Sequence, residues 1–230
     1  MARLPRLALA GELHYLMQRG HNRQHVFLDD LDRAAFLAML RDAAQQCGVA
    51  IHAYVLLDAE VHCLATPRDA MSLSRLMQSM GRRYVAAFNH RHNRSGTLWA
   101  GRFRAGLIDG VLLGADALVH VESLPVRMGL VAAAADWPWS SAAHHVGRVR
   151  DPLIVEHTAY WLLGNTPFER ESAHAHRLRE GVSTLQAQGF ERALMQGRAA
   201  GSPEFGMAVA ERSGLPMQSR PRGRPAHKPG

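Results

Sequence analysis

The order of strand and helix signals along residues 12–123 is the feature that most limits how this chain can fold. Segments rich in residues that favour strands alternate with segments whose apolar residues recur every three or four positions. Acidic residues favour a helix start at Asp29, and Gly48 is a typical C-terminal cap. Strands are expected at 12–19, 50–57, 61–66 and 97–109, and helices at 29–48, 72–88 and 111–123.

This order is typical of an α+β fold, a ferredoxin-like antiparallel sheet with helices on one face. The pattern changes after residues 137–141, where short helical segments separated by Gly, Pro and Asn follow. We therefore expect three parts: a domain at 1–150, a helical C-terminal extension at 151–215 and a disordered basic tail at 216–230. Within the extension, helices are expected at 152–164, 168–188, 190–199 and 203–213.

Composition sets the broad class of protein. The 230 residues fit one large domain with an appendage, and a hydrophobic fraction of 47% excludes wholesale disorder. No apolar run approaches the roughly 20 residues that cross a bilayer, so no membrane partner is expected. The two cysteines, Cys47 and Cys63, form no disulfide scaffold, which indicates a cytoplasmic protein.

The distribution of charge favours a nucleic-acid partner. The formal net charge is +7, and two acid-free blocks, residues 81–108 with six arginines and 216–230 with four basic residues, carry more than all of it. Such blocks are typical of proteins that neutralise phosphates, although a solvated surface is the simpler interpretation of a single block. All basic residues except Lys228 are arginine, which suits phosphate recognition but also follows from a GC-rich genome.

The triplet Glu60-Val61-His62 lies on a predicted strand. Side chains two positions apart on a strand point to one face, so Glu60 and His62 could hold a divalent cation together. A single triplet of this kind is weak evidence, because most such triplets are accidents of a surface or a core.

Six sequence blocks resemble the Y1 (single-tyrosine) HUH transposase family, in particular its IS200-like, REP-associated tyrosine transposase branch. Their order and spacing are more specific than any one block. They lie at 14–20, 52–57, 83–89, 96–103, 125–131 and 137–141. The resemblance implies a single-strand DNA transesterase in which two histidines hold Mg²⁺ or Mn²⁺. It also implies a helix-borne tyrosine that attacks the scissile phosphate, and an amide or carboxylate side chain one helical turn later that completes the metal shell.

The chain departs from the family pattern at all three chemical positions. Glu60 stands where the family has its first metal histidine, His120 replaces the nucleophilic tyrosine, and Leu124 replaces the amide. The resemblance therefore implies a DNA-binding protein that is impaired in strand cleavage. Two alternatives stay open: a metal-dependent nuclease that uses Glu60, His62 and His120, and an RNA-binding or regulatory derivative. The four tyrosines, at 15, 54, 84 and 160, are expected to pack with their hydroxyls at the surface.

Single-stranded or hairpin DNA is the expected partner, with no small-molecule cofactor and with a monomer favoured over a homodimer. Trp99 is expected either to stack on bases or to lie in the core, and the tail resembles an AT-hook at Arg222 and Arg224, although a solvated tail is the competing interpretation. Candidate phosphate contacts are Arg19, Arg82, Arg83, Arg102 and Arg104.

Overall fold

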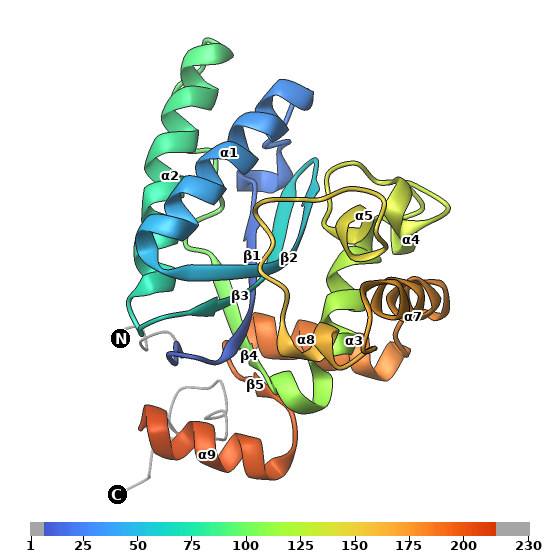
Figure 1. Cartoon of the computed structure of the whole chain (residues 1–230). Coiled ribbons are helices and arrows are strands. Elements are labelled where there is room, and N and C mark those ends of the chain that lie inside the picture. Colours follow the sequence, from blue (N-terminus) through green and yellow to red (C-terminus); the bar gives the residue numbers. More distant parts are fainter. Residues whose placement is uncertain (1–6, 215–230) are drawn as a thin grey trace, which may run out of the picture.

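The computed structural model describes residues 7–214, and a five-stranded sheet forms the centre of this part of the chain (Figure 1). The strands lie in the order β2-β3-β1-β4-β5, and neighbouring pairs are antiparallel except β4 with β5. The predicted antiparallel sheet and α+β class are confirmed. The strands are β1 (Leu13–Arg19), β2 (Val49–Leu57), β3 (Glu60–Pro67), β4 (Arg104–Ile108) and β5 (Ala199–Ala200).

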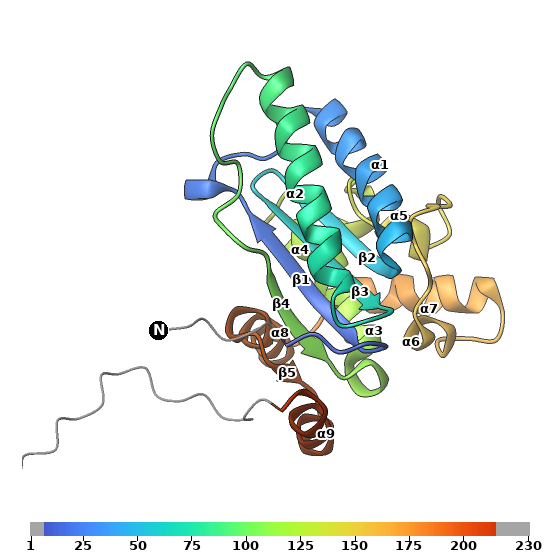
Figure 2. The ribbon, with the colours of Figure 1, turned by 90° about the vertical axis from the view of Figure 1, so that its left-hand side faces the viewer.

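Helices cover both faces of this sheet. Helices α1 (Asp30–Cys47) and α2 (Ser72–Arg91) lie on one face, and α3 (Gly110–Glu122) and α8 (Thr184–Gln196) on the other (Figures 1 and 2). The expectation of helices on one face therefore holds for α1 and α2 but not for α3. The physical reason is that β1 carries apolar side chains on both faces, Leu16 toward α1 and α2 and Tyr15 toward α3, so both faces need cover.

The predicted ends of the first helix match the structure. The Asp29 side chain accepts a hydrogen bond from the Asp32 amide at 3.0 Å, and Gly48 ends the helix in the left-handed conformation at φ 65°. The predicted strand at 97–109 is shorter than expected, because only Arg104–Ile108 pairs with β1 and residue Trp99 meets Gly20 in an isolated bridge.

The C-terminal extension is helical, but its breaks fall elsewhere than predicted. The segment expected as one helix at 168–188 is divided, because α7 stops before Gly181 (φ 72°) and Ser183 begins α8 with a capping box to Gln186. Most of 152–164 is irregular, and 190–199 contains the second half of α8. The remaining helices are α4 (Leu124–Arg127), α5 (Ala142–His145), α6 (Thr158–Trp161), α7 (Pro167–Glu180) and α9 (Pro203–Ser213), with 3₁₀ turns at η1 (His21–Arg23) and η2 (Ala134–Asp136).

Helix α8 lies directly on β4, because Gly106 leaves room for it. A side chain at Gly106 would come within 2.6–2.8 Å of the backbone of Ala193 and Leu194. Strand β5 then pairs with the outer edge of β4, so the C-terminal extension completes the central sheet. Within residues 7–214, no helix combines the length and apolarity needed to cross a bilayer. The tail residues Arg222 and Arg224 lie outside the described part.

Candidate functional site

The strand register brings the proposed metal residues to the face that α3 covers. Strand β3 pairs with β1 so that Glu60 lies opposite Arg19, and His62 lies opposite Met17. Directly opposed residues share a face, and Tyr15 shares the face of Met17 because it lies two positions away. Arg19, Tyr15, Glu60 and His62 therefore meet, and we call these four residues the Tyr15 network.

Hydrogen bonds link the Tyr15 network from the surface to the core. The Nε–H of Arg19 donates to Glu60 Oε1 at 2.5 Å, and the Nε2–H of His62 donates to Glu60 Oε2 at 3.0 Å. That leaves His62 Nδ1 as the acceptor for the Tyr15 hydroxyl at 2.7 Å. The hydrogen bond from His62, aided by Arg19, lowers the pKa of Glu60, so this carboxylate is ionised.

His120 lies beside this network but is closed off from solvent. Its ring contacts Tyr15 edge-on at 5.5 Å and Phe190 of α8 at 5.0 Å, and only 1% of the residue is exposed. Arg127 donates to His120 Nδ1 at 2.9 Å, which places the ring proton on Nε2. Burial, with smaller contributions from Arg127 and His62, lowers the pKa of His120 to about 3. His120 is therefore neutral, and its one lone pair is already engaged.

Glu60, His62 and the residues expected to complete a metal site with them do not fit a divalent cation. Both oxygens of Glu60 and both ring nitrogens of His62 have partners, and the guanidinium of Arg19 already supplies the positive charge. Leu124 is buried and offers no donor atom, and it begins α4, since the helix that carries His120 ends at Glu122. Mg²⁺ and Mn²⁺ prefer several oxygen ligands, which this site does not offer.

Tyr15 is a site residue that sequence reasoning missed. The expectation that the tyrosine hydroxyls lie at the surface is wrong, since each donates to a partner in the interior or at its edge. Tyr15 donates to His62, Tyr54 to Asp151 and Tyr84 to the Val26 carbonyl. Tyr160 in turn donates to the carbonyl of His145. The pairing of Tyr15 with His62 depends on strand register, which no local sequence signal specifies.

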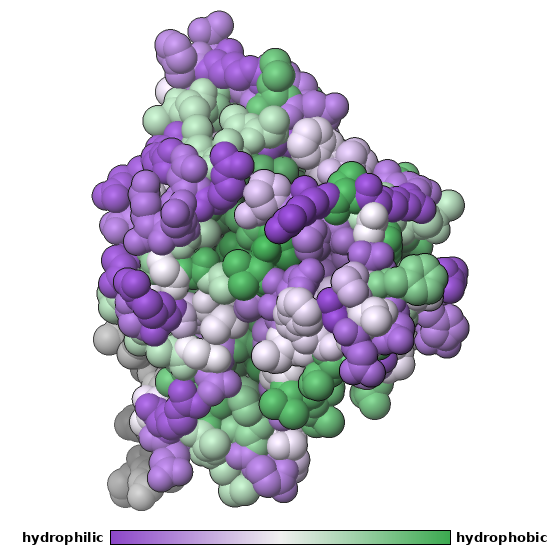
Figure 3. All heavy atoms as spheres, viewed as in Figure 1, coloured by the Kyte–Doolittle hydropathy of each residue, from purple (hydrophilic) through white to green (hydrophobic). Residues whose placement is uncertain are grey.

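The candidate DNA contacts do not form one surface. Arg82 and Arg83 are exposed on α2, on the opposite side of the sheet from Glu60, and Arg83 pairs with Asp42 at 3.6 Å. Figure 3 shows hydrophilic side chains over α1 and α2. Arg102 is exposed, and Arg104 donates to the Met195 carbonyl at 3.1 Å.

Trp99 lies in the core rather than on an accessible surface. It is 7% exposed, and its ring lies 6.4 Å from that of Phe36 and 6.1 Å from that of Tyr84. In this conformation the indole has no free face for a base to stack on.

A second polar cluster, also missed from the sequence, lies wholly inside the C-terminal half. Glu122, His145 and His174 are each 0% exposed, and we call them the buried triad. His145 Nδ1 donates to one Glu122 oxygen at 2.6 Å, and His174 Nε2 donates to the other at 2.7 Å. Ser141 also donates to Glu122. The two nitrogens and a carboxylate are a donor set that can hold a transition metal, and their present spacing is that of hydrogen bonds.

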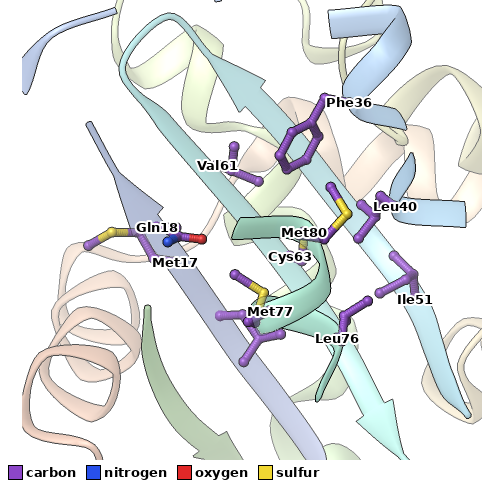
Figure 4. Close-up of a pocket in the computed structure, with 11 residues that line it drawn as sticks. Met17, Gln18, Phe36, Leu40, Ile51, Val61, Cys63, Leu76, Met77 and Met80 are labelled. Carbon is purple, nitrogen blue, oxygen red and sulfur yellow. The ribbon is translucent and has the colours of Figure 1, made fainter. Parts of the chain in front are cut away.

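The cavity between the sheet and helices α1 and α2 is apolar and small (Figure 4). Its volume is about 20 Å³, enough for about one water molecule. Met77, Met80 and the buried thiol of Cys63 line it. It is a packing defect in the core and not a ligand site.

Comparisons with known proteins gave one family model and two solved structures. The family model described as "Transposase IS200 like" matches residues 12–115. A solved REP-associated tyrosine transposase, bound to a REP hairpin, shares the fold with a TM-score of 0.52 and 22% identity, over 67% of this chain and 91% of that one. A protein of Deinococcus radiodurans described as a transposase is 24% identical, with a TM-score of 0.35, over 45% of this chain and 84% of that one. The comparison with curated proteins gave no match.

Proposed function

We propose that this chain belongs to the IS200-like, single-tyrosine transposase family, whose model matches residues 12–115, and that it binds single-stranded or hairpin DNA without cutting it. The hairpin in the structure of the REP-associated relative supports this choice of partner. The proposed partner places the protein in the cytoplasm, at the nucleoid.

One observation carries the proposed loss of cleavage: the closed environment of His120. A nucleophile needs a free lone pair and access to the phosphate. The lone pair of His120 accepts from Arg127, and the ring lies under Phe190. A phosphoramidate at His120 would require both contacts to break, which argues against the nuclease that uses Glu60, His62 and His120.

The proposed DNA contacts are arginines, in keeping with their fit to phosphate oxygens. Arg19 and Arg102 lie near the C-terminal end of β1, the central strand, whereas Arg82 and Arg83 are exposed on α2. Two distant groups of cations are compatible with a hairpin that passes around one edge of the sheet. Arg222 and Arg224 of the tail remain proposed minor-groove contacts.

A denaturing gel tests the absence of cleavage. A labelled single strand that carries a hairpin is incubated with the protein in Mg²⁺ or Mn²⁺, and the gel is read for a covalent protein–DNA adduct. We expect none with the wild type. The triple variant Glu60→His/His120→Tyr/Leu124→Asn serves as the positive control. An adduct with this variant means that the fold and the DNA-binding surface are intact. An adduct with the wild type that disappears in His120→Ala contradicts the proposal.

The Tyr15 network favours a second candidate, a nuclease whose nucleophile is Tyr15. Glu60, His62 and Tyr15 are linked in the order carboxylate, imidazole, hydroxyl, which is the order that activates nucleophiles in many enzymes. Burial, however, raises the pKa of Tyr15 far above its usual range, and the ring is 2% exposed. An adduct that persists in His120→Ala but vanishes in Tyr15→Phe supports this candidate.

The RNA-binding alternative is tested with the same hairpin made of RNA. Tighter binding of the RNA hairpin than of the DNA hairpin favours a regulatory RNA-binding role.

A further inference from the structure

Arg19 places a cation where the family resemblance implies a metal ion. Its guanidinium sits against Glu60, the residue at the position of the first metal histidine. We propose that Arg19 holds a DNA phosphate in place of the divalent cation, so that DNA binding by this protein is independent of metal. This inference rests on the proposed function, since it names how that function is carried out at this site.

The contacts of Arg19 leave a suitable part of the side chain free. Its Nε–H donates to Glu60 at 2.5 Å, and within residues 7–214 neither terminal nitrogen has a hydrogen-bond partner. The side chain is 35% exposed, against 26% for Glu60. A guanidinium held at Nε presents its two terminal N–H groups in a fixed plane, the geometry that matches two oxygens of a phosphate.

Arg19 begins a loop, residues 19–25, that is hydrogen-bonded to a second loop, residues 92–103, between α2 and β4. We call these two segments the corner loops. Gly20 pairs with Trp99, and the Ala100 amide donates to the Arg19 carbonyl at 2.8 Å. The side-chain Nε2–H of Gln24 donates to the Leu98 carbonyl at 2.8 Å. Figure 2 shows both loops at the same end of the molecule, beside the end of β1. These hydrogen bonds hold the corner loops in one arrangement without a ligand.

The first corner loop is held in an unusual backbone conformation that faces solvent. Asn22 and Arg23 have φ of 51° and 57°, in the left-handed region that favours glycine. Such conformations persist where the surroundings impose them, and they are frequent at binding sites. Here the turn leaves His21, Arg23 and His25 exposed.

The charge of the corner loops is of one sign. Residues 19–25 contain two arginines and residues 92–103 contain two more, and neither loop contains an acidic residue. Arg102 is exposed and Arg94 is half-buried, donating to Gln24 at 3.1 Å. A single DNA strand suits this surface, since Arg102 and Arg23 are exposed and Arg19 is partly exposed, so all three can offer N–H groups to phosphates.

Fluorescence anisotropy with a labelled DNA hairpin that carries a single-stranded flank tests the inference. Binding is measured in EDTA and in MgCl₂ or MnCl₂ at equal ionic strength. We expect the dissociation constants to agree within about twofold. Arg19→Gln is expected to weaken binding about tenfold, equivalent to about 1.4 kcal/mol, and to lower the salt slope by about one.

Two further variants separate a binding role from a structural one. Arg75→Gln is the matched control, because Arg75 forms a similar ion pair with Asp69 at the opposite end of α2 from the corner loops, and it is expected to bind as the wild type does. Glu60→Gln keeps the shape of the side chain and removes the competing negative charge, so it is expected to bind at least as tightly as the wild type in EDTA. Thermal melts establish that each variant is folded.

The outcomes distinguish this inference from the proposed function. A wild type that binds the hairpin only with Mg²⁺ or Mn²⁺, or a folded Arg19→Gln variant with unchanged affinity and salt slope, overturns the inference and leaves DNA binding intact. A wild type that prefers the hairpin no more than random duplex in any buffer removes both.

Discussion

The ring of Phe190 in α8 lies 5.0 Å from the imidazole of His120 in α3, at an angle of 54°. Seventy positions separate the two residues in the sequence, yet both are almost fully buried. The C-terminal extension thus packs directly on His120. The contact between Phe190 and His120 therefore both closes His120 off from solvent and completes the core.

Truncation of Phe190 should therefore be costly. Phe190→Ala is expected to lower the free energy of unfolding by about 3–5 kcal/mol, because it opens a cavity among Tyr15, His120 and Leu194. Urea denaturation monitored by circular dichroism measures the change. Phe168→Ala is the control, since Phe168 is 77% exposed and its loss should change stability by less than about 0.5 kcal/mol. Equal effects of the two variants would contradict the packing described for α8.

The buried triad should respond strongly to loss of its carboxylate. Glu122→Ala removes the acceptor for His145 and His174, and we expect a loss of about 3–5 kcal/mol. Glu180→Ala is the matched change at the exposed ion pair between Glu180 and His176, where the effect should stay below about 1 kcal/mol.

The buried triad is held by hydrogen bonds and not by a metal ion. Its nitrogen–oxygen distances of 2.6 and 2.7 Å are shorter than the roughly 3.3 Å that separates ligand atoms around a tetrahedral zinc ion. EDTA should therefore leave the melting temperature unchanged, and a drop in EDTA would identify a bound metal.

Acid should destabilise the protein before its ordinary carboxylates titrate. Burial lowers the pKa of His14 and of His52 to about 4, and that of His120 to about 3. Between these values and 6.5 the unfolded chain binds more protons than the folded one, so stability falls as pH decreases through this window.

Urea unfolding at pH 4.5–7 measures this slope. His52→Gln should flatten it, because His52 is one of the buried groups, whereas His176→Gln should not, since the His176 side chain is 62% exposed. Stability that stays constant or rises from pH 6.5 to 4.5 would show that these imidazoles are accessible to protons in the folded state.

Adding a single methyl group at Gly106 is predicted to displace α8 from the sheet. In Gly106→Ala the new Cβ would lie 2.6–2.8 Å from the backbone of Ala193 and Leu194, so helix and strand must separate. A loss of about 1–3 kcal/mol is expected in urea denaturation. Gly81→Ala is the control: the new methyl has no neighbour within 4 Å, and the change should raise helix stability by about 0.5–1 kcal/mol. If Gly106→Ala is neutral, α8 does not pack on β4 as described.

The sequence predicts local structure well because the relevant signals are local. The cap at Asp29, the left-handed stop at Gly48 and the shared face of Glu60 and His62 all follow from spacing along a few residues. The break at Gly181 was also predictable, since Ser183 and Gln186 form a capping box directly after it.

Other features could not be predicted, because they depend on contacts between distant segments. The hydrogen bond between Tyr15 and His62 needs the register of β1 against β3. The packing of Phe190 on His120 requires α8 to lie against the sheet although it follows α3 by about 60 residues in the sequence. The sequence did not assign the candidate phosphate contacts to faces of the sheet, and Arg82 and Arg19, both among those candidates, lie on opposite sides of it.

The pairing of Ile108 with Ala200 also has a consequence for synthesis of the protein. Strand β4 leaves the ribosome about 90 residues before β5, which takes about 5–20 seconds at usual elongation rates. During that interval the outer edge of β4 is unpaired, and the face of the sheet that α8 will cover is open. The nascent chain thus carries an unprotected strand edge beside an apolar surface, the combination that promotes association between chains. The speed of translation through the extension, and any chaperone that binds the nascent chain, would therefore affect how much of the protein reaches this fold.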